Sequence, residues 1–287
     1  MLSTRPEWLK MKAPDEEILN KMANMIEGLS LHTVCESADC PNIGECFKHK
    51  TATFMVMGDV CTRNCRFCAV TKGHPSPLDK EEPKKVAAVS KKLGLKHIVI
   101  TSVTRDDLED GGADHFVKII KEIRKQNPGS TVELLIPDLK GNWNALKKII
   151  DAKPDILNHN VETIESLYKK VRPMAVYTRS IELLKQVKIF NRDVYTKSGI
   201  MVGLGETKEQ VIKVMDDLLK VKCDILTIGQ YLRPSKKHLP VFEYVTPERF
   251  KEYREIALKK GFKFVASGTY VRSSYRAFEG MEALKNI

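Results

Sequence analysis

Six of the seven cysteines of this 287-residue chain lie within 34 consecutive residues, in two triplets of different spacing. The first triplet has the pattern C-x4-C-x5-C and the second has C-x3-C-x2-C, and their members are Cys35, Cys40 and Cys46, and Cys61, Cys65 and Cys68. Cysteine thiolates are soft ligands that favour zinc and iron–sulfur clusters. Because a structural zinc or a conventional [4Fe–4S] cluster takes four protein ligands, three thiolates leave one position open. Each triplet therefore predicts a metal centre with an open or unusual fourth ligand.

The second triplet follows directly after the first strand that the sequence predicts, residues 51–57. Its short spacing allows all three sulfurs to curl around one cluster on a loop, with the fourth iron left free. An open iron at the end of a strand can bind a small, chelating, redox-active molecule. The alternative for either triplet is a zinc ion or an inert cluster that only holds a loop in place.

The second triplet, with Phe67 directly before its last cysteine, resembles the motif of the radical S-adenosylmethionine (SAM) superfamily. The resemblance implies a [4Fe–4S] cluster on Cys61, Cys65 and Cys68 whose free iron binds the amino and carboxylate groups of SAM. It further implies that the cluster donates an electron and cleaves SAM to methionine and a 5′-deoxyadenosyl radical. In such enzymes the cofactor supplies the difficult chemistry, and the protein binds and orients it.

The first triplet and six further motifs narrow the resemblance to the lipoyl synthase family, nearly end to end. The motifs are 6-PEWLK-10, 105-RDDLEDGGA-113, 158-NHNVET-163, 196-TKSGIMVGLGET-207, 229-GQYLRPSKKHLPV-241 and 272-RSSY-275. In that family the first triplet and a serine of the RSSY motif hold an auxiliary [4Fe–4S] cluster, which is consumed as the sulfur source. The ligands implied here are Cys35, Cys40, Cys46 and Ser274, with Ser274 expected rather than its neighbour Ser273. A hard serine oxygen would be the weak point of such a cluster, and its loss would let a sulfide leave.

The resemblance implies insertion of two sulfur atoms, at C6 and C8 of an octanoyl group that is amide-linked to a lysine of a carrier domain. Two hydrogen abstractions, each consuming one SAM, would precede the insertions, so both clusters should face one cavity. The implied partners are octanoylated lipoyl domains of 2-oxoacid dehydrogenase E2 subunits and the glycine cleavage H protein, with flavodoxin or ferredoxin as the reductant. A monomer is expected, and neither nucleic acid nor a membrane is expected as a partner.

Polar residues near the ends of predicted strands are candidates for binding the nucleoside and methionine parts of SAM. They are Thr104, Asn158, Asn160, Glu162 and Lys197. For residues 158–162 the alternative is capping of the helix that follows. For Lys197 the alternative is an ion pair within the protein.

The elements that would position these residues alternate between apolar, strand-like runs and amphipathic, helix-length segments, which predicts βα units around a parallel sheet. The expected strands are 51–57, 97–102, 131–137, 155–160, 196–203, 224–230 and 262–267. The expected helices are 82–94, 114–128, 142–153, 180–191, 207–221 and 246–261. The pattern predicts a partial TIM-type (β/α)6 barrel, a fold whose functional residues lie at the carboxyl ends of the strands.

Three regions are expected along the chain. They are an N-terminal extension with the auxiliary cysteines (1–50), a radical-SAM barrel (51–267) and a C-terminal tail with the RSSY motif (268–287). The extension is expected to lie over the barrel, and the tail is expected at the same rim as the cysteines. The tail reads GTYVRSSY where the family has Gly-Pro-Leu before its arginine-serine motif, a departure that concerns the path of the tail and not its ligand.

The composition favours a cytoplasmic protein. No run of about 18 apolar residues occurs, and the first residues lack a signal-peptide pattern. A reducing compartment favours metal ligation over disulfides for clustered cysteines. The formal charge of +11 comes from 48 Lys and Arg against 37 Asp and Glu, and it suits solvated helix faces and an acidic partner. Cys223, the remaining cysteine, is expected in the core.

Two other functions stay open on the sequence. A radical SAM methylthiotransferase that acts on tRNA or a ribosomal protein also pairs two clusters, but it spreads its auxiliary cysteines through a separate N-terminal domain. A non-catalytic iron–sulfur electron carrier or scaffold would not need a full barrel with polar residues at its strand ends.

Overall fold

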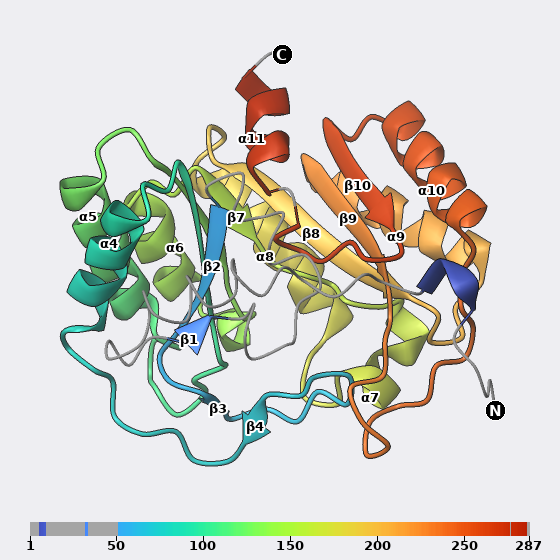
Figure 1. The fold of residues 1–287 in the computed structure, drawn as a ribbon, viewed down its shortest axis with the longest axis horizontal. Coiled ribbons are helices and arrows are strands. Elements are labelled where there is room, and N and C mark those ends of the chain that lie inside the picture. The colour runs from blue at the N-terminus through green and yellow to red at the C-terminus, as the bar shows by residue number, and fades with distance from the viewer. Residues whose placement is uncertain (1–5, 10–31, 34–50, 276, 286–287) are drawn as a thin grey trace.

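The computed structural model describes residues 6–9, 32–33, 51–275 and 277–285, so the first cysteine triplet lies outside the described residues. The centre of the fold is a sheet in which seven parallel strands follow one another in chain order (Figure 1). They are β2 (Thr51–Val56), β5 (His97–Ser102), β6 (Thr131–Leu135), β7 (Ile156–Asn158), β8 (Tyr195–Val202), β9 (Ile225–Gln230) and β10 (Phe264–Gly268). This sequential strand order is that of a barrel, because in a doubly wound sheet the strand order reverses at one point. The seven predicted strands and the partial (β/α)6 barrel are confirmed, as six βα units and a seventh strand.

Six long helices connect these strands and cover the outer side of the curved sheet (Figure 1). They are α4 (Glu82–Lys92), α5 (Ala113–Gln126), α6 (Trp143–Asp151), α8 (Tyr177–Phe190), α9 (Lys208–Lys220) and α10 (Pro247–Lys260). Each overlaps a predicted helix. The side chain of Thr207 accepts a hydrogen bond from the backbone N–H of Gln210, which completes a capping box at the start of α9.

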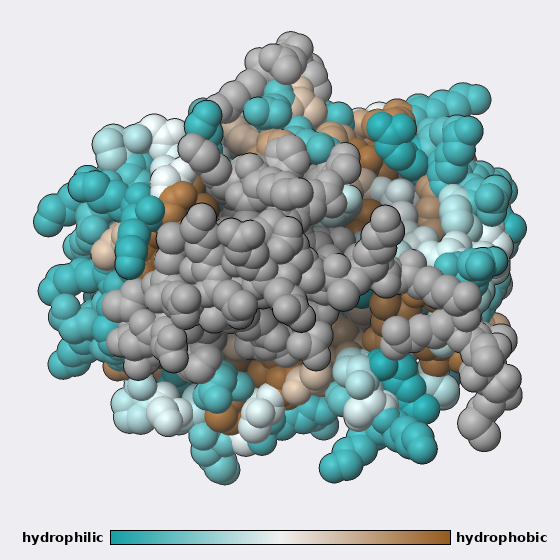
Figure 2. All heavy atoms as spheres, in the orientation of Figure 1, coloured by the Kyte–Doolittle hydropathy of each residue, from teal (hydrophilic) through white to brown (hydrophobic). Residues whose placement is uncertain are grey.

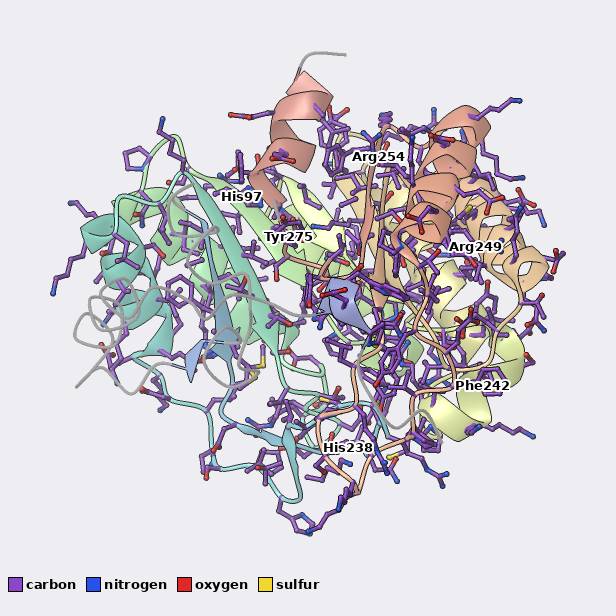
Figure 3. All side chains as sticks on the ribbon, turned by 45° about the vertical axis from the view of Figure 1, so that its right-hand side comes forward. His97, His238, Phe242, Arg249, Arg254 and Tyr275 are labelled. Atoms are coloured by element: carbon purple, nitrogen blue, oxygen red, sulfur yellow. The ribbon has the colours of Figure 1, made fainter. Side chains whose placement is uncertain are left out.

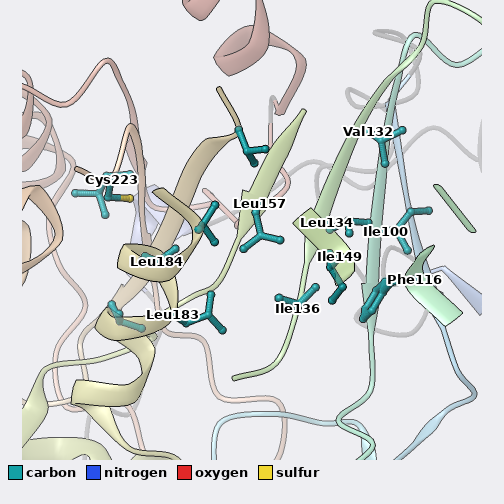
Figure 4. Packing of buried hydrophobic residues seen from close by; sticks show 14 of the residues in the cluster. Ile100, Phe116, Val132, Leu134, Ile136, Ile149, Leu157, Leu183, Leu184 and Cys223 are labelled. Atoms are coloured by element: carbon teal, nitrogen blue, oxygen red, sulfur yellow. The ribbon is translucent and has the colours of Figure 1, made fainter. Parts of the chain in front are cut away.

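The core lies between the sheet and these helices (Figure 4). Ile100 and Leu134 project from β5 and β6 and pack with Phe116 of α5 and Ile149 of α6, and all four are fully buried. Burial of each such side chain contributes about 1.5–3 kcal/mol to folding. Cys223 is buried in the same cluster, as predicted. Among the described residues, no helix is both long and apolar enough to cross a membrane.

Several short elements were not predicted. Strand β1 (His32–Thr33) pairs antiparallel with β2 at the edge of the sheet. Strands β3 (Val60–Cys61) and β4 (Thr71–Lys72) form a separate parallel pair beyond the end of β2. Two-residue strands carry no periodicity that a sequence pattern can show.

The C-terminal tail ends in a helix, α11 (Ala277–Lys285), that was not predicted either. Its Met281 and Leu284 pack with Ile156 and Ile225, the first residues of β7 and β9. Helix α11 therefore covers the amino-terminal end of the sheet, and the expectation that the whole tail lies at the catalytic rim is wrong for this helix.

Candidate active site at the carboxyl ends of the strands

The second cysteine triplet lies on the loop between β3 and β4, which we call the cysteine loop (residues 61–68). Its first residue is fastened to the end of β5. The backbone N–H of Thr104 donates to Cys61 Sγ at 3.4 Å, and the hydroxyl and N–H of Thr62 donate to the carbonyl of Thr104 at 2.9 and 3.1 Å. The N–H of Arg63 also points at Cys61 Sγ, at 3.4 Å. These two backbone N–H groups hold the Cys61 sulfur in place beyond the end of β5.

Arg63, between the first two cysteines, ties the cysteine loop to two further strand ends. Its guanidinium donates to Asp106 (Nε to Oδ2, 2.7 Å) after β5 and to Asp138 (Nη2 to Oδ1, 2.5 Å) after β6. Burial alone would raise the pKa of Asp138, but Arg63 outweighs it and lowers that pKa to about 2. Arg179 reaches the other oxygen of Asp138 at 3.2 Å. This network was not foreseen from the sequence.

The 105-RDDLEDGGA-113 motif supports the chain just before the cysteine loop. Arg105 donates to the carbonyl of Met57 at 3.1 Å and pairs with Asp107 at 2.8 Å. The carboxylate of Glu82 accepts from the N–H of Met57. A β-carbon at Gly112 would fall well inside 3.0 Å of the Met57 sulfur, so only glycine fits there. This motif therefore builds the rim, and its hydrogen bonds to the described part of the chain do not involve a cysteine sulfur.

The three thiols of the cysteine loop influence one another, so they gather in one place. Burial is the main cause that raises the pKa of Cys68 to about 11, and the neighbouring Cys65 and Cys61 contribute to that rise. Burial also raises the pKa of Cys65, and the guanidinium of Arg172 opposes that rise. Deprotonation of such buried thiols therefore needs a positive centre among them, which iron supplies.

The donor set of the cysteine loop fits a [4Fe–4S] cluster. Among the described residues, no three His, Cys, Asp or Glu side chains are close enough together to hold a single metal ion. A cluster does not require that closeness, because each of its cysteines ligates a different iron. Three half-buried thiols on one loop, with N–H groups at Cys61 Sγ, suit a cluster with one iron open.

Beside the cysteine loop, the ends of β7 and β8 present unpaired acceptors. The buried Asn160 donates to Glu162 (Nδ2 to Oε1, 3.1 Å), while its Oδ1 has no hydrogen-bond partner among the residues that the structure describes. Gly199 of β8 makes room for this amide, because a β-carbon there would lie 2.8 Å from Asn160 Oδ1. Burial raises the pKa of Glu162, and Arg172 opposes that rise. A buried acceptor without a partner is expensive, so a ligand that donates hydrogen bonds fits this place.

Two other predicted site residues lie deeper, on the inner side of the sheet. Lys197 of β8 forms an ion pair with Glu133 of β6 (Nζ to Oε1, 2.9 Å), which is the alternative that the sequence left open. Asn158 donates to the same carboxylate at 3.0 Å, and His97 lies 3.4 Å from it. Burial alone would raise the pKa of Glu133, but Lys197 and His97 lower it to about 2. These residues form a polar layer, in which the buried Asn158 Oδ1 has no hydrogen-bond partner within the described part of the chain.

Arg172 is a central residue that the sequence analysis missed. It is 8% exposed and donates to the carbonyls of Asn160 (2.9 Å) and Val161 (3.3 Å), the chain that carries Glu162. The neighbouring Val171 accepts from the N–H of Arg66 in the cysteine loop at 2.9 Å. Residues 171–172 therefore connect the cysteine loop to the acceptors after β7.

The tail enters the site across β9. A β-carbon at Gly229 would fall well inside 3.0 Å of the carbonyl oxygen of Val271, so the tail backbone lies directly on the strand. Ser273 and Ser274 follow in a turn in which the N–H of Tyr275 donates to the carbonyl of Arg272 at 2.9 Å. Figure 3 shows Tyr275 toward the end of the sheet where His97 lies and His238 at the opposite end. The serines thus lie on the inner side of the sheet, between the rim and α11.

Comparison with known proteins gives a consistent result. The family model of the Radical SAM superfamily matches residues 55–218. A lipoyl synthase from Caldanaerobacter subterraneus subsp. tengcongensis is 60% identical over 281 residues, which cover 98% of each chain. A lipoyl synthase from Caldicellulosiruptor bescii is 53% identical over 99% of this chain and 97% of its own.

Solved structures resemble the fold at much lower identity. Streptococcus suis SuiB bound to S-adenosylmethionine has a TM-score of 0.59 at 11% identity, over 88% of this chain and 60% of its own. Methylornithine synthase has a TM-score of 0.57 at 15% identity, over 75% of this chain and 70% of its own.

Proposed function

Because the chain belongs to the lipoyl synthase family of radical SAM enzymes, we propose a residue-level account of how it inserts sulfur into a protein-bound octanoyl group. Enzymes of this family use SAM and [4Fe–4S] clusters, and an octanoylated lipoyl-domain protein is the substrate that this function implies. The lipoyl synthases that it resembles align almost end to end, which does not favour a methylthiotransferase or a non-catalytic carrier.

In our proposal, Cys61, Cys65 and Cys68 hold the reducing cluster. The observation that carries this assignment is the placement of three half-buried thiols on one short loop, with two backbone N–H groups directed at Cys61 Sγ. When bound there, the cluster and SAM together supply the hydrogen-abstracting chemistry at C6 and C8 of the octanoyl chain. Arg63 keeps the cysteine loop against Asp106 and Asp138 while this chemistry takes place.

The candidate SAM-binding residues fall into two groups by geometry. Asn160 and Glu162 offer acceptors for the ammonium and hydroxyl donors of SAM, and Thr104 adds a half-buried hydroxyl beside Cys61. Asn158 and Lys197 are fully buried and contribute from the polar layer beneath. We propose that all five residues belong to the cofactor-binding set. Asn158 and Lys197 would act indirectly, by supporting the other three.

The auxiliary cluster is proposed to bind Cys35, Cys40, Cys46 and Ser274. The position of the tail supports this choice, because its close contact with Gly229 holds the RSSY turn on the inner side of the sheet. A hydroxyl oxygen is a hard ligand on a soft cluster, so this bond would be the first to break when sulfide leaves. We retain the division into 1–50, 51–267 and 268–287, which is supported by the first parallel strand starting at Thr51 and the last ending at Gly268.

We further propose, as partners, the E2 lipoyl domains of 2-oxoacid dehydrogenases and the glycine cleavage H protein, with flavodoxin or ferredoxin as reductant. A monomer in the cytoplasm is the proposed state. The net charge of +11 supports acidic protein partners, because opposite charge speeds association.

An anaerobic single-turnover reaction tests the proposal. Reconstituted protein, dithionite, SAM and an octanoyl-lysine peptide are mixed, and peptide mass and 5′-deoxyadenosine are followed together. The expected result is a peptide with two added sulfurs, lost in Ser274→Ala and kept in the matched control Ser273→Ala. Deoxyadenosine without added sulfur in the wild-type chain would contradict the proposed substrate, and loss of sulfur insertion in Ser273→Ala alone would exchange the two serines.

A further inference from the structure

The loop after β9 forms a compact turn whose outer side is cationic, which we call the basic turn (residues 233–238). Arg233 donates from Nε to the carbonyl of His238 at 2.8 Å and also bonds the carbonyl of Lys236. Ser235 Oγ lies 2.9 Å from His238 Nδ1 and accepts from the N–H of Lys237 at 3.2 Å. The backbone of the turn is therefore preorganised, and the side chains of Lys236 and Lys237 take no part in it.

The basic turn is docked on the cysteine loop. His238 Nε2 lies 3.1 Å from the carbonyl of Cys68, and the N–H of Leu239 donates to the carbonyl of Arg66 at 3.3 Å. A carbonyl only accepts, so Nε2 carries the proton and the Ser235 hydroxyl donates to Nδ1 when the ring is neutral. One hydrogen bond thus separates a proposed cluster ligand from a side chain of the basic turn.

Charge on the basic turn differs from charge on the helices. Many helix lysines pair with carboxylates, as Lys147 does with Asp151 and Lys213 with Asp217. Arg66, Lys236 and Lys237 are exposed and form no ion pair within the part of the chain that the structure describes. Figure 2 shows hydrophilic surface where the turn lies, at the lower edge of the molecule. Three unpaired cations beside the cysteine loop create a local positive field.

We propose that the basic turn and Arg66 form the docking surface for a small acidic electron-transfer protein, an inference that rests on the proposed function. One electron leaves the reduced partner, which is oxidised, and enters the cluster on Cys61, Cys65 and Cys68, which is reduced. Electron-transfer complexes are small and transient, and a few unpaired charges are sufficient to steer them.

Position favours an electron donor over the octanoylated carrier as the occupant. The lysine arm of a carrier must reach the inner side of the sheet, where Asn160 and the RSSY turn lie. The basic turn instead contacts the cysteine loop through the backbone of Arg66 and Cys68, at the end of the molecule opposite Tyr275 (Figure 3). A donor on this surface needs no access to the inner side, because an electron has only to reach the cysteine loop.

The test uses the double charge reversal Lys236→Glu and Lys237→Glu in the reconstituted protein, and Arg66 is left unchanged because it lies between two cysteines of the cysteine loop. The matched control is Lys118→Glu with Lys121→Glu, two exposed lysines of α5. Binding of an oxidised, acidic bacterial flavodoxin is measured by fluorescence anisotropy at low and high salt. 5′-Deoxyadenosine formation is measured with reduced flavodoxin and, separately, with dithionite.

The expected result for the double variant is at least a 10-fold loss of flavodoxin affinity and of the flavodoxin-supported rate at low salt, with a smaller loss at high salt. Its dithionite-supported rate and its KM for an octanoylated carrier domain should equal those of the wild type, and the control should keep all four values. Unchanged flavodoxin binding would overturn the inference. A raised carrier KM with dithionite would also overturn it and assign the surface to the carrier. A wild-type chain that makes no deoxyadenosine with dithionite would instead refute the proposed function, while the binding measurement still decides the docking surface.

Discussion

The guanidinium of Arg63, between two cysteines of the cysteine loop, donates to the Asp106 carboxylate from both Nε (2.7 Å) and Nη2 (2.9 Å). A bidentate pair of this kind fixes orientation as well as distance. The same guanidinium also reaches Asp138, whose side chain is fully buried. The position of the cysteine loop is thus determined by charges on the ends of two neighbouring strands.

Replacing Arg63 with Met should reduce cluster loading on the cysteine loop several-fold. The change leaves the buried Asp138 with Arg179 and the N–H of Lys140 but without Arg63, and breaking a buried pair costs about 3–5 kcal/mol. Iron and sulfide per chain would be measured in a background in which Cys35, Cys40 and Cys46 are alanine. The iron content of Arg63→Lys should lie between those of the wild type and Arg63→Met, because lysine keeps the positive charge but cannot make the bidentate contact of a guanidinium. Wild-type iron content in Arg63→Met would rule out this role.

Gly229→Ala should displace the tail and lose the auxiliary cluster while sparing the first. The new β-carbon would overlap the carbonyl oxygen of Val271. Gly268→Ala is the matched control, because Gly268 pairs with Gly229 in the sheet and its β-carbon would meet Val271 only at 3.4 Å. Iron content should fall by about half in Gly229→Ala alone, with deoxyadenosine formation kept. Equal iron in both variants would show that the tail does not depend on this contact.

Lys197→Met should destabilise the fold by about 3–5 kcal/mol, because it leaves the buried Glu133 carboxylate with Asn158 and His97 beside it but without its lysine. Adding Glu133→Gln should recover much of that loss, as measured by anaerobic urea unfolding. Lys251→Met, at an exposed pair with Glu255, should change stability by no more than about 0.5 kcal/mol. If Lys197→Met with Glu133→Gln regains stability but not SAM affinity, then Lys197 contributes to cofactor binding in addition to stabilising the fold.

The stability of the chain should fall between pH 7 and pH 5 because of His159. Burial lowers the pKa of His159 to about 4 from an ordinary value of 6.5, so the unfolded chain binds a proton in this range and the folded chain does not. The loss is about 2 kcal/mol at pH 5. Glu133, with a pKa lowered to about 2, stabilises the fold above about pH 4.5, and this contribution is lost only at lower pH, so it does not account for a change between pH 7 and pH 5.

Urea unfolding of the cluster-free chain at the two pH values, beside His159→Gln, provides the measurement. The variant should lose about 2 kcal/mol less than the wild type on acidification. Parallel losses in the two chains would assign the pH dependence to other groups.

Local patterns were sufficient to predict the barrel and the place of the cysteine loop. Strands such as β5 and β9 are apolar runs between helices, and caps such as Thr207 act within one turn, so both are visible in the sequence. The contacts that organise the site cannot be seen in the sequence. Arg63 and Asp138 are 75 residues apart, and no periodicity relates them.

The same limit explains why Arg172 was missed and why the role of Lys197 stayed open. Arg172 lies in a stretch that resembles an ordinary loop, yet it is buried and bonds the carbonyl of Asn160. Lys197 lies at a strand position that could face a ligand or a partner, and only the fold brings Glu133 beneath it. Helix α11 follows the part of the tail that departs from the family pattern, and its apolar side chains gain meaning only against Ile156 and Ile225.

The route of the tail also determines when the molecule can be completed. Val271 rests on β9, and α11 rests on the first residues of β7 and β9, so neither contact can form until those strands are assembled. Ser274 follows Cys68 by 206 residues and therefore leaves the ribosome well after both cysteine triplets. A nascent or truncated chain would have the cysteines of both triplets well before it has the serine. Under the proposed ligand set, the auxiliary site is complete only after β7, β9 and the tail have assembled.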